Sequence, residues 1–119
     1  MYKRQVNINR EHFEPVIKGM SRSVQFGTGK TAFLDDIEIC GKTGTSQNRG
    51  KDHSVFFAFA PRENPTIAIA VYVENGGWGS DFGAPMASLM IEQYINGEID
   101  ENRLFLKDKL NKTNLLAKN

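Results

Sequence analysis

The sequence predicts an α+β fold in which an antiparallel β-sheet, a three-strand meander, is flanked by helices. Apolar residues recur at helical spacing over residues 11–25 and again over residues 85–95. Between them lie three strand-like stretches joined by short polar connections, and such connections favour antiparallel neighbours. Val6 and Ile8 alternate with polar residues near the N terminus, so a fourth strand there stays open.

Both predicted helices carry a start or stop signal beside an apolar face. Pro15 suits a first helical turn, because the N–H group that proline lacks has no helical partner there. Asn96 and Gly97 close the second helix, since both tolerate a left-handed cap. The apolar faces comprise Phe13, Val16, Ile17, Met20 and Val24 in the first helix and Met86, Leu89, Met90 and Tyr94 in the second. Residues 100–119 mix leucines with many charges, which predicts a weakly packed helical or frayed tail.

The three predicted strands have different boundaries. Ile37 and Ile39 are spaced as on the buried side of a strand, and this strand is expected to end near Lys42. The second strand covers residues 55–60 and stops before a proline. The third covers residues 66–73 and is rich in β-branched side chains. Because the second and third strands are continuously apolar, we expect cover on both faces of the sheet.

Length and composition indicate one globular domain. The chain has 119 residues, of which 39% are hydrophobic and 24% are charged. A net charge of +1 gives no bulk attraction to nucleic acid or to an anionic membrane, so neither partner is expected on this ground. No apolar run reaches the roughly 18 residues of a membrane-spanning helix. The single cysteine, Cys40, excludes an internal disulfide and is predicted to be a small buried strand residue.

The segment Lys42-Thr43-Gly44-Thr45 has a residue order that indicates chemistry rather than packing. Lys42 supplies a compact cation that can hold an anion or share a proton with a hydroxyl. Thr43 and Thr45 add hydroxyl groups, and the backbone N–H groups of an exposed strand edge can stabilise a developing oxyanion. Gly44 has no Cβ atom, so a ligand backbone can approach it closely.

Strand geometry limits how one ligand can use this segment. Strict alternation places Lys42 and Gly44 on one face and Thr45 on the other. A single ligand therefore meets both sets only if it binds along the twisted edge of the strand. Chance alone would produce these four residues in order about 0.002 times in a chain of this composition. We predict an edge site for a substrate that is both peptide-like and anionic.

Other chemistries fit the pattern poorly. A Walker A phosphate loop needs a glycine five positions before its Gly-Lys pair, where the two Gly-Lys-Thr triplets have Val24 and Asp36. Asp35 and Asp36 are expected to form a turn rather than a metal site, because no further ligands cluster with them. His53 is expected to be a hydrogen-bonded turn histidine rather than a catalytic base. Neither a metal nor a cofactor is predicted.

The motif and its surroundings resemble the C-terminal end of the transpeptidase domain of class B penicillin-binding proteins. The likeness is carried by Lys42-Thr43-Gly44-Thr45 and by residues 12–20, 27–32, 53–61 and 73–77. Within that class it is most similar to the cell-elongation group, penicillin-binding protein 2, and the K-T-G element is a signature of the superfamily. The resemblance implies a partial penicillin-binding transpeptidase, or serine β-lactamase-like, fold over residues 1–99, with residues 100–119 as the tail.

The resemblance also implies a peptidoglycan D,D-transpeptidase. In this family the serine of an S-x-x-K motif attacks the D-alanyl-D-alanine end of a stem peptide and forms an acyl-enzyme, and β-lactams trap the same serine. By motif position, Lys42 would join the proton and charge network, and Gly44 would leave room for the ligand. Thr45 would bind the substrate carboxylate through its hydroxyl and form half of the oxyanion hole with its backbone N–H. Thr43 would add a second substrate-binding hydroxyl. The loop around Trp78 is rich in glycine, and such loops often border sites, so Trp78 is either a rim or substrate contact or a packing residue.

The nucleophile motif of this family is missing from the chain. None of the serines has a lysine three positions later; these serines are Ser21, Ser23, Ser46, Ser54, Ser80 and Ser88. Ser46-Gln47-Asn48 matches the family's S-x-N pattern but directly follows the K-T-G strand, whereas the family's element lies well upstream. We therefore expect a fragment that is inactive alone and supplies one wall of a cleft. The parent protein is expected at the periplasmic face of the cell inner membrane, held by an N-terminal anchor outside this chain.

A sheet without its usual partners exposes apolar faces and edges, so we also expect the fragment to self-associate, as a dimer or a strand-exchanged oligomer. Two other functions remain open. One is a non-catalytic module that binds a partner through its sheet edge or through a groove near Trp78. The other is a β-lactam sensor or a serine β-lactamase relative, although residues 27–29 look more like class B transpeptidases. An S-x-x-K motif in the upstream gene sequence, preceded by a membrane anchor, would favour the transpeptidase.

Overall fold

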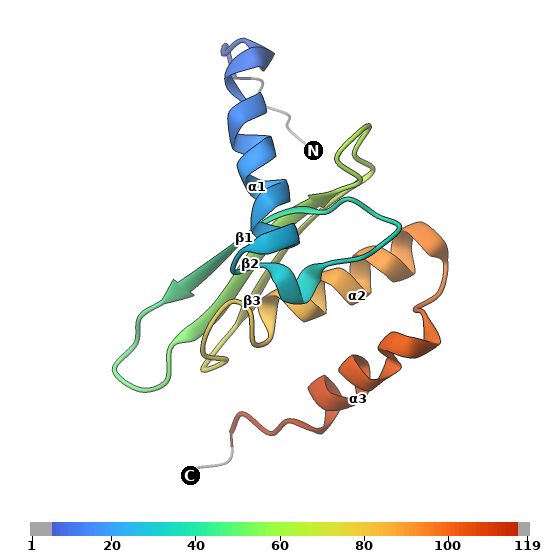
Figure 1. The fold of residues 1–119 in the computed structure, drawn as a ribbon. Coiled ribbons are helices and arrows are strands. Elements are labelled where there is room, and N and C mark those ends of the chain that lie inside the picture. The colour runs from blue at the N-terminus through green and yellow to red at the C-terminus, as the bar shows by residue number, and fades with distance from the viewer. Residues whose placement is uncertain (1–5, 117–119) are drawn as a thin grey trace.

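The computed structural model describes residues 6–116 and shows an α+β fold, as predicted (Figure 1). A three-stranded antiparallel sheet has the order β1-β2-β3, so the predicted meander is confirmed. In chain order the elements are η1 (Arg10–His12), α1 (Glu14–Phe26), η2 (Lys30–Ala32), β1 (Cys40–Ser46), β2 (His53–Ala60), β3 (Ile67–Val73), α2 (Gly83–Asn96), η3 (Glu101–Arg103) and α3 (Leu104–Lys112).

The first strand begins later than the sequence indicated. Ile37 and Ile39 are buried, but they precede β1, which starts at Cys40. The reason is the partner strand: β2 ends before Pro61, and the last pair of the ladder joins Cys40 to Phe59. Proline has no N–H group to extend a ladder. The motif therefore lies inside β1, and the expectation that Lys42 marks the end of the strand was wrong.

The open alternative of a fourth, N-terminal strand finds no support in the described residues. Val6 and Ile8 are exposed and belong to no strand, and η1 begins at Arg10. The remainder of that segment, residues 1–5, lies outside the described residues.

The two main helices follow their predicted signals. Pro15 lies in the first turn of α1, and the helix ends where the Gly27 N–H donates to Ser23 O. Gly97 caps α2 with a positive φ of 82° and donates its N–H to Gln93 O. Figure 1 shows that the N-terminal half of α1 projects away from the sheet. The predicted apolar face of α1 is accordingly covered only near its C-terminal end, where Val24 is buried.

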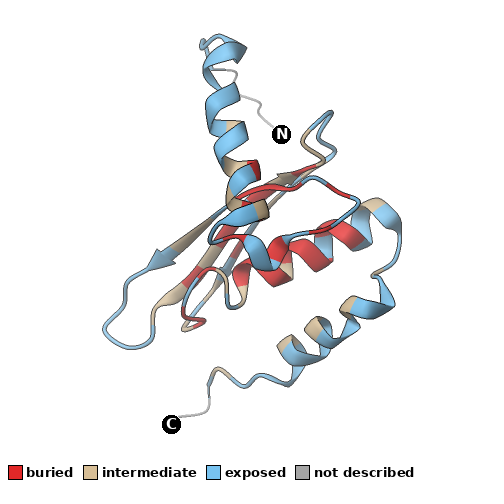
Figure 2. Ribbon diagram, in the orientation of Figure 1, coloured by how far each residue is buried: buried red, intermediate tan, exposed pale blue. Residues whose placement is uncertain are grey.

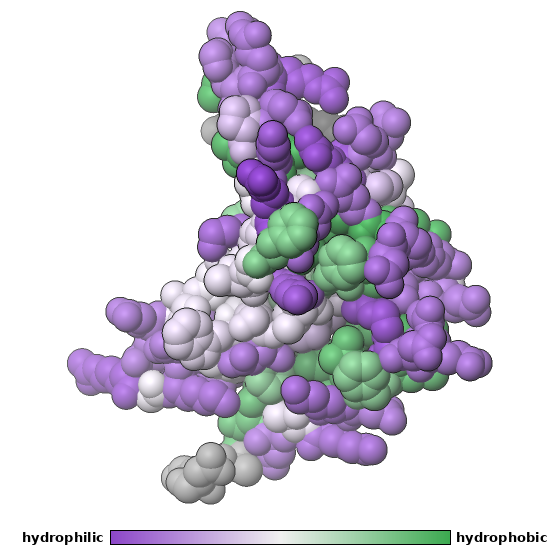
Figure 3. Space-filling view, viewed as in Figure 1, coloured by the Kyte–Doolittle hydropathy of each residue, from purple (hydrophilic) through white to green (hydrophobic). Residues whose placement is uncertain are grey.

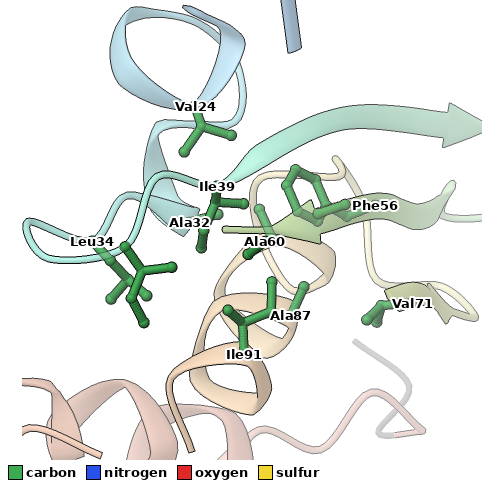
Figure 4. Packing of buried hydrophobic residues seen from close by; sticks show 12 residues of the cluster. Val24, Ala32, Leu34, Ile39, Phe56, Ala60, Val71, Ala87 and Ile91 are labelled. Carbon is green, nitrogen blue, oxygen red and sulfur yellow. The ribbon is translucent and has the colours of Figure 1, made fainter. Parts of the chain in front are cut away.

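The hydrophobic core lies between α2 and one face of the sheet. Phe56, Ile39 and Ile91 are fully buried in it, and Val24 of α1 and Ala32 of η2 belong to the same cluster (Figure 4). A Cβ atom at Gly41 would overlap the Phe56 ring, and one at Gly83 would lie 2.9 Å from Phe56 Cβ. Real Cβ atoms do not come so close to other carbon atoms, so the two glycines let β1 and α2 pack against this ring. Buried residues gather along α2 and the adjoining strands (Figure 2).

The opposite face of the sheet is open in the described part of the chain. Phe57 and Tyr72 point to that face and are 46% and 56% exposed. The expectation of cover on both faces is therefore not met by residues 6–116. Figure 3 shows the other side of the molecule, where hydrophobic atoms gather at the middle and the projecting end of α1 is hydrophilic.

A buried ion pair ties the C-terminal segment to α2. Arg103 Nη1 lies 2.5 Å from Glu92 Oε2, and Arg103 Nη2 donates to Ser88 Oγ at 2.7 Å. The other carboxylate oxygen of Glu92 accepts the Asp100 N–H at 3.1 Å. Only 4% of the Glu92 side chain and 16% of the Arg103 side chain are exposed. The position of residues 100–103 is thus set by polar contacts, while α3 itself buries no residue.

Arg103→Met is expected to lower the free energy of unfolding by about 3 to 5 kcal/mol, because it leaves the Glu92 carboxylate buried without its cation. Urea unfolding followed by circular dichroism measures the loss. Lys107→Met is the matched control, since it removes an exposed cation from α3 and should change stability little. The double variant Arg103→Met with Glu92→Leu should recover most of the loss. Equal losses of unfolding free energy in Arg103→Met and Lys107→Met would contradict the conclusion that the Arg103–Glu92 ion pair stabilises the fold.

Cys40 gives a second test of the packing around β1. Burial, with the nearby Glu38 carboxylate, raises the pKa of the Cys40 thiol to about 11. The ordinary thiol pKa near 8.5 applies to the unfolded chain. The contribution of Cys40 to the free energy of unfolding should therefore be constant below about pH 8.5 and fall as the pH rises from there toward 11, because the thiol ionises in that range only in the unfolded chain.

The rate of reaction with a thiol reagent at pH 8 reports the burial of the Cys40 thiol. The folded chain should react far more slowly than the chain unfolded in urea. Cys40→Ala should abolish both the reaction and this part of the pH dependence. Rapid labelling of the folded chain would show that the thiol is not buried.

Candidate functional site

The segment Lys42-Thr43-Gly44-Thr45 lies within β1, at one edge of the sheet. It borders a surface hollow of about 330 Å³ that the loop between β3 and α2 closes from the other side. The hollow is lined by Thr28, Lys42, Thr43, Gly44, Thr45, Trp78, Gly79 and Ser80. All five residues predicted from the sequence thus border one hollow.

The two faces of β1 contribute different groups. Lys42 and Gly44 pair with Phe57 and Val55, on the open face, whereas Thr43 pairs with the buried Phe56. The hollow includes residues of both sets because it runs along the edge of β1. No strand among residues 6–116 occupies that edge, so its backbone groups can meet an extended ligand.

The charge in the hollow comes from Lys42. Its Nζ donates to Thr43 O at 2.7 Å, and within the described part of the chain it forms no ion pair. The side chain is exposed. An ammonium group without a carboxylate partner is available to an anionic ligand.

Thr28 is a site residue that the sequence reasoning missed. Its hydroxyl lies 2.7 Å from the Thr43 hydroxyl, at hydrogen-bonding distance. The N–H groups of Gly27 and Gly29 both donate to Ser23 O, which turns the chain after α1 and brings Thr28 against β1. The Gly-Thr-Gly pattern contributed only to the family resemblance; a threonine between two glycines shortly before the motif strand was the available signal.

The glycine-rich loop packs its backbone directly onto the sheet. A Cβ atom at Gly79 would overlap Val55 O and would lie 2.8 Å from Gly44 O. Only glycine fits there, and this close approach places Trp78 at the rim of the hollow. Trp78 is 72% exposed, so its ring is open to a ligand rather than part of the core.

His53 supports the same loop from its other end. Its Nδ1 accepts the Asn75 N–H at 3.0 Å, and its ring lies 5.3 Å from that of Tyr72. The predicted turn histidine therefore has a hydrogen bond, and it does not line the hollow.

The groups in the hollow suit binding rather than complete catalysis. One ammonium group and several hydroxyls face a strand edge, an arrangement that can hold a peptide with a carboxylate. Among residues 6–116, no cluster of three histidine, cysteine, aspartate or glutamate side chains could hold a metal ion. No helix in that range is long and apolar enough to cross a membrane.

Comparison with known proteins gives one consistent result. Residues 2–92 match the family model of the penicillin binding protein transpeptidase domain. The curated peptidoglycan D,D-transpeptidase MrdA of Haemophilus influenzae is 33% identical over 92 residues, which cover 63% of this chain and 14% of that protein.

Two solved structures share the fold. One is Pseudomonas aeruginosa PBP2 in complex with WCK 5153, with a TM-score of 0.65, 35% identity, and coverage of 82% of this chain and 23% of that one. The other is the imipenem acyl-enzyme complex of penicillin-binding protein A from Mycobacterium tuberculosis, with a TM-score of 0.68, 27% identity, and coverage of 79% and 21%.

The chain spans less than a quarter of the length of each of these proteins. The family match nevertheless covers most of the chain and includes every residue of the hollow. This chain belongs to the penicillin-binding protein transpeptidase family.

Proposed function

We propose that the chain supplies the carboxylate-binding wall of a D,D-transpeptidase that cross-links peptidoglycan stem peptides through a serine acyl-enzyme. One observation carries this proposal: a cation, three threonine hydroxyls and an unpaired strand edge border a single hollow of about 330 Å³. The D-alanyl-D-alanine end of a stem peptide is extended and ends in a carboxylate, which matches those groups. The serine nucleophile belongs to residues outside this chain, because no S-x-x-K motif occurs in it.

Each residue then has a specific role. The Thr45 hydroxyl binds the terminal carboxylate, and the Thr45 N–H forms half of the oxyanion hole. Lys42 contributes positive charge to the network around the nucleophile. Thr43, oriented by Thr28, adds a second hydroxyl, and Gly44 lets the peptide lie against the strand.

The complete domain would also bind β-lactams and would need no cofactor. The M. tuberculosis relative was solved as an imipenem acyl-enzyme, which supports β-lactam binding at the equivalent site. We place the parent protein at the periplasmic face of the inner membrane, where its substrate is assembled, with a membrane anchor outside this chain. Trp78 would form the rim of the cleft beside the bound ligand.

The present chain should gain no mass when it is incubated with benzylpenicillin. A chimera tests whether this chain can supply the carboxylate-binding wall. In it, the region of H. influenzae MrdA that aligns with this chain over 92 residues is replaced by the matching part of this chain. The chimera should acquire one benzylpenicillin adduct, detected by intact mass. Thr45→Ala in the chimera should slow acylation about tenfold, because a hydrogen bond to a charged carboxylate is lost.

Thr66→Ala is the matched control, since Thr66 is an exposed threonine between β2 and β3 and lies outside the hollow. It should leave the acylation rate unchanged. An adduct on a serine of the 119-residue chain alone would overturn the claim that the nucleophile lies elsewhere. Equal acylation rates of the Thr45→Ala and Thr66→Ala chimeras would overturn the role of Thr45.

We also propose that this chain self-associates through β3. The outer edge of β3 has no partner strand among residues 6–116, and the strand consists of seven apolar residues. Phe57 and Tyr72 are exposed on the adjoining face of the sheet. Unpaired apolar edges of this kind favour pairing with another chain.

Sedimentation velocity at rising concentration should show a dimer or larger oligomer. Ala70→Lys places a charge at an exposed position in the middle of β3 and should shift the chain to the monomer. Asn111→Lys adds the same charge to the surface of α3 and should leave the association unchanged. A wild-type chain that remains monomeric throughout would rule out the proposal.

A further inference from the structure

Ser54 on β2 holds the loop that closes the hollow. It pairs with Thr45 across the sheet and is fully buried. Its hydroxyl donates to Trp78 O at 2.6 Å and accepts the Gly83 N–H at 3.0 Å. One hydroxyl therefore joins the central strand, the rim loop and the first turn of α2.

The loop has a local structure of its own around Trp78. The Trp78 N–H donates to Asp81 Oδ2 at 2.9 Å, and the Asp81 N–H donates back to Trp78 O at 2.9 Å. These two bonds close a turn over residues 78–81 without any help from the sheet. The bond from Ser54 is different, because it attaches this finished turn to β2.

Close packing leaves no substitute for the Ser54 hydroxyl. A Cβ atom at Gly76 would lie 2.9 Å from Ser54 Cβ, so the loop backbone passes directly over this side chain. Gly83 is buried, and its N–H bonds to no other group among the described residues. An alanine at position 54 would leave that N–H, and one bond of Trp78 O, without a partner in a dry environment.

Ser54 does not have the surroundings of a nucleophile. It is inaccessible, and the residue three positions later is Phe57 rather than lysine. Both hydrogen-bonding functions of its hydroxyl are already used by backbone groups.

We propose that Ser54 is a positioning residue that sets the distance between the Trp78 rim and the Thr45 wall of the hollow. The attachment of the loop to β2 by Ser54 follows from the hydrogen bonds of its hydroxyl. The consequence for ligand binding rests on the proposed transpeptidase function. Ser54 and Thr45 are cross-strand neighbours, so a loosened loop widens the hollow directly opposite the carboxylate-binding hydroxyl.

The test compares Ser54→Ala with Ser23→Ala in the 119-residue chain. Ser23 is the matched control, because its buried hydroxyl has no hydrogen-bond partner among residues 6–116. Amide hydrogen exchange by NMR should rise about tenfold or more at Gly83 in Ser54→Ala, because its N–H loses its partner. The rise should be smaller at Trp78 and Asp81, whose N–H groups keep their local bonds, and smallest in the β1–β2 ladder. Ser23→Ala should change neither region.

Trp78 is the single tryptophan, so its fluorescence anisotropy reports the same loop without a label. The anisotropy should fall in Ser54→Ala and stay constant in Ser23→Ala. Ser54→Cys keeps a side chain of similar shape but with a weaker hydrogen-bond donor, so exchange in the loop should lie between that of the wild type and that of Ser54→Ala. This variant replaces Ser54→Ala in the test if the alanine variant is too unstable. An equal rise of exchange throughout the sheet, or no rise in the loop, would overturn the positioning role.

The MrdA chimera separates this inference from the proposed function. Ser54→Ala in the chimera should slow acylation by benzylpenicillin several-fold, whereas Ser23→Ala should not. If the chimera without further substitutions is not acylated, the proposed function fails. The hydrogen-exchange result still tests whether Ser54 attaches the loop to β2. If Ser54→Ala loosens the loop but leaves acylation unchanged, the consequence for the hollow is refuted.

Discussion

The packing of the Phe56 ring fixes how the strands and α2 fit together. Phe56 is fully buried in the central strand, and β1 passes over its ring at Gly41 while α2 begins beside it at Gly83. A side chain at either glycine would displace the ring or its neighbour. Because protein interiors are close-packed, this contact fixes the spacing of the edge strand, the central strand and the helix together.

The hollow forms where this core ends and backbone meets backbone. Gly79 lies against Gly44 and Val55, Thr28 meets Thr43, and the loop from β3 returns over the start of β2. None of these contacts is a large apolar surface; they are hydrogen bonds and close glycine approaches. Such contacts position polar groups well, but they are stable only because the core beneath them is rigid.

The molecule is packed on one side only. Helix α2 covers one face of the sheet, while Phe57 and Tyr72 stay exposed on the other and the end of α1 projects (Figures 1 and 2). The chain covers only 14% of the H. influenzae MrdA protein and 23% of the P. aeruginosa PBP2 structure. An open apolar face and an unpaired strand edge favour contact with further protein.

The local elements and the K-T-G-T motif can be read directly from the amino-acid sequence. Helical periodicity identifies α1 and α2, and short continuous apolar runs bounded by turn residues identify β2 and β3, because each signal depends on neighbours a few residues away. The start of β1 cannot be read in this way, because it depends on the partner strand β2, which ends before Pro61, about 20 residues further along the chain. The same holds for the contacts of Thr28 with Thr43 and of Ser54 with the loop that borders the hollow. Their hydrogen bonds join residues 15 to 29 positions apart, and no periodic pattern encodes which distant polar groups meet.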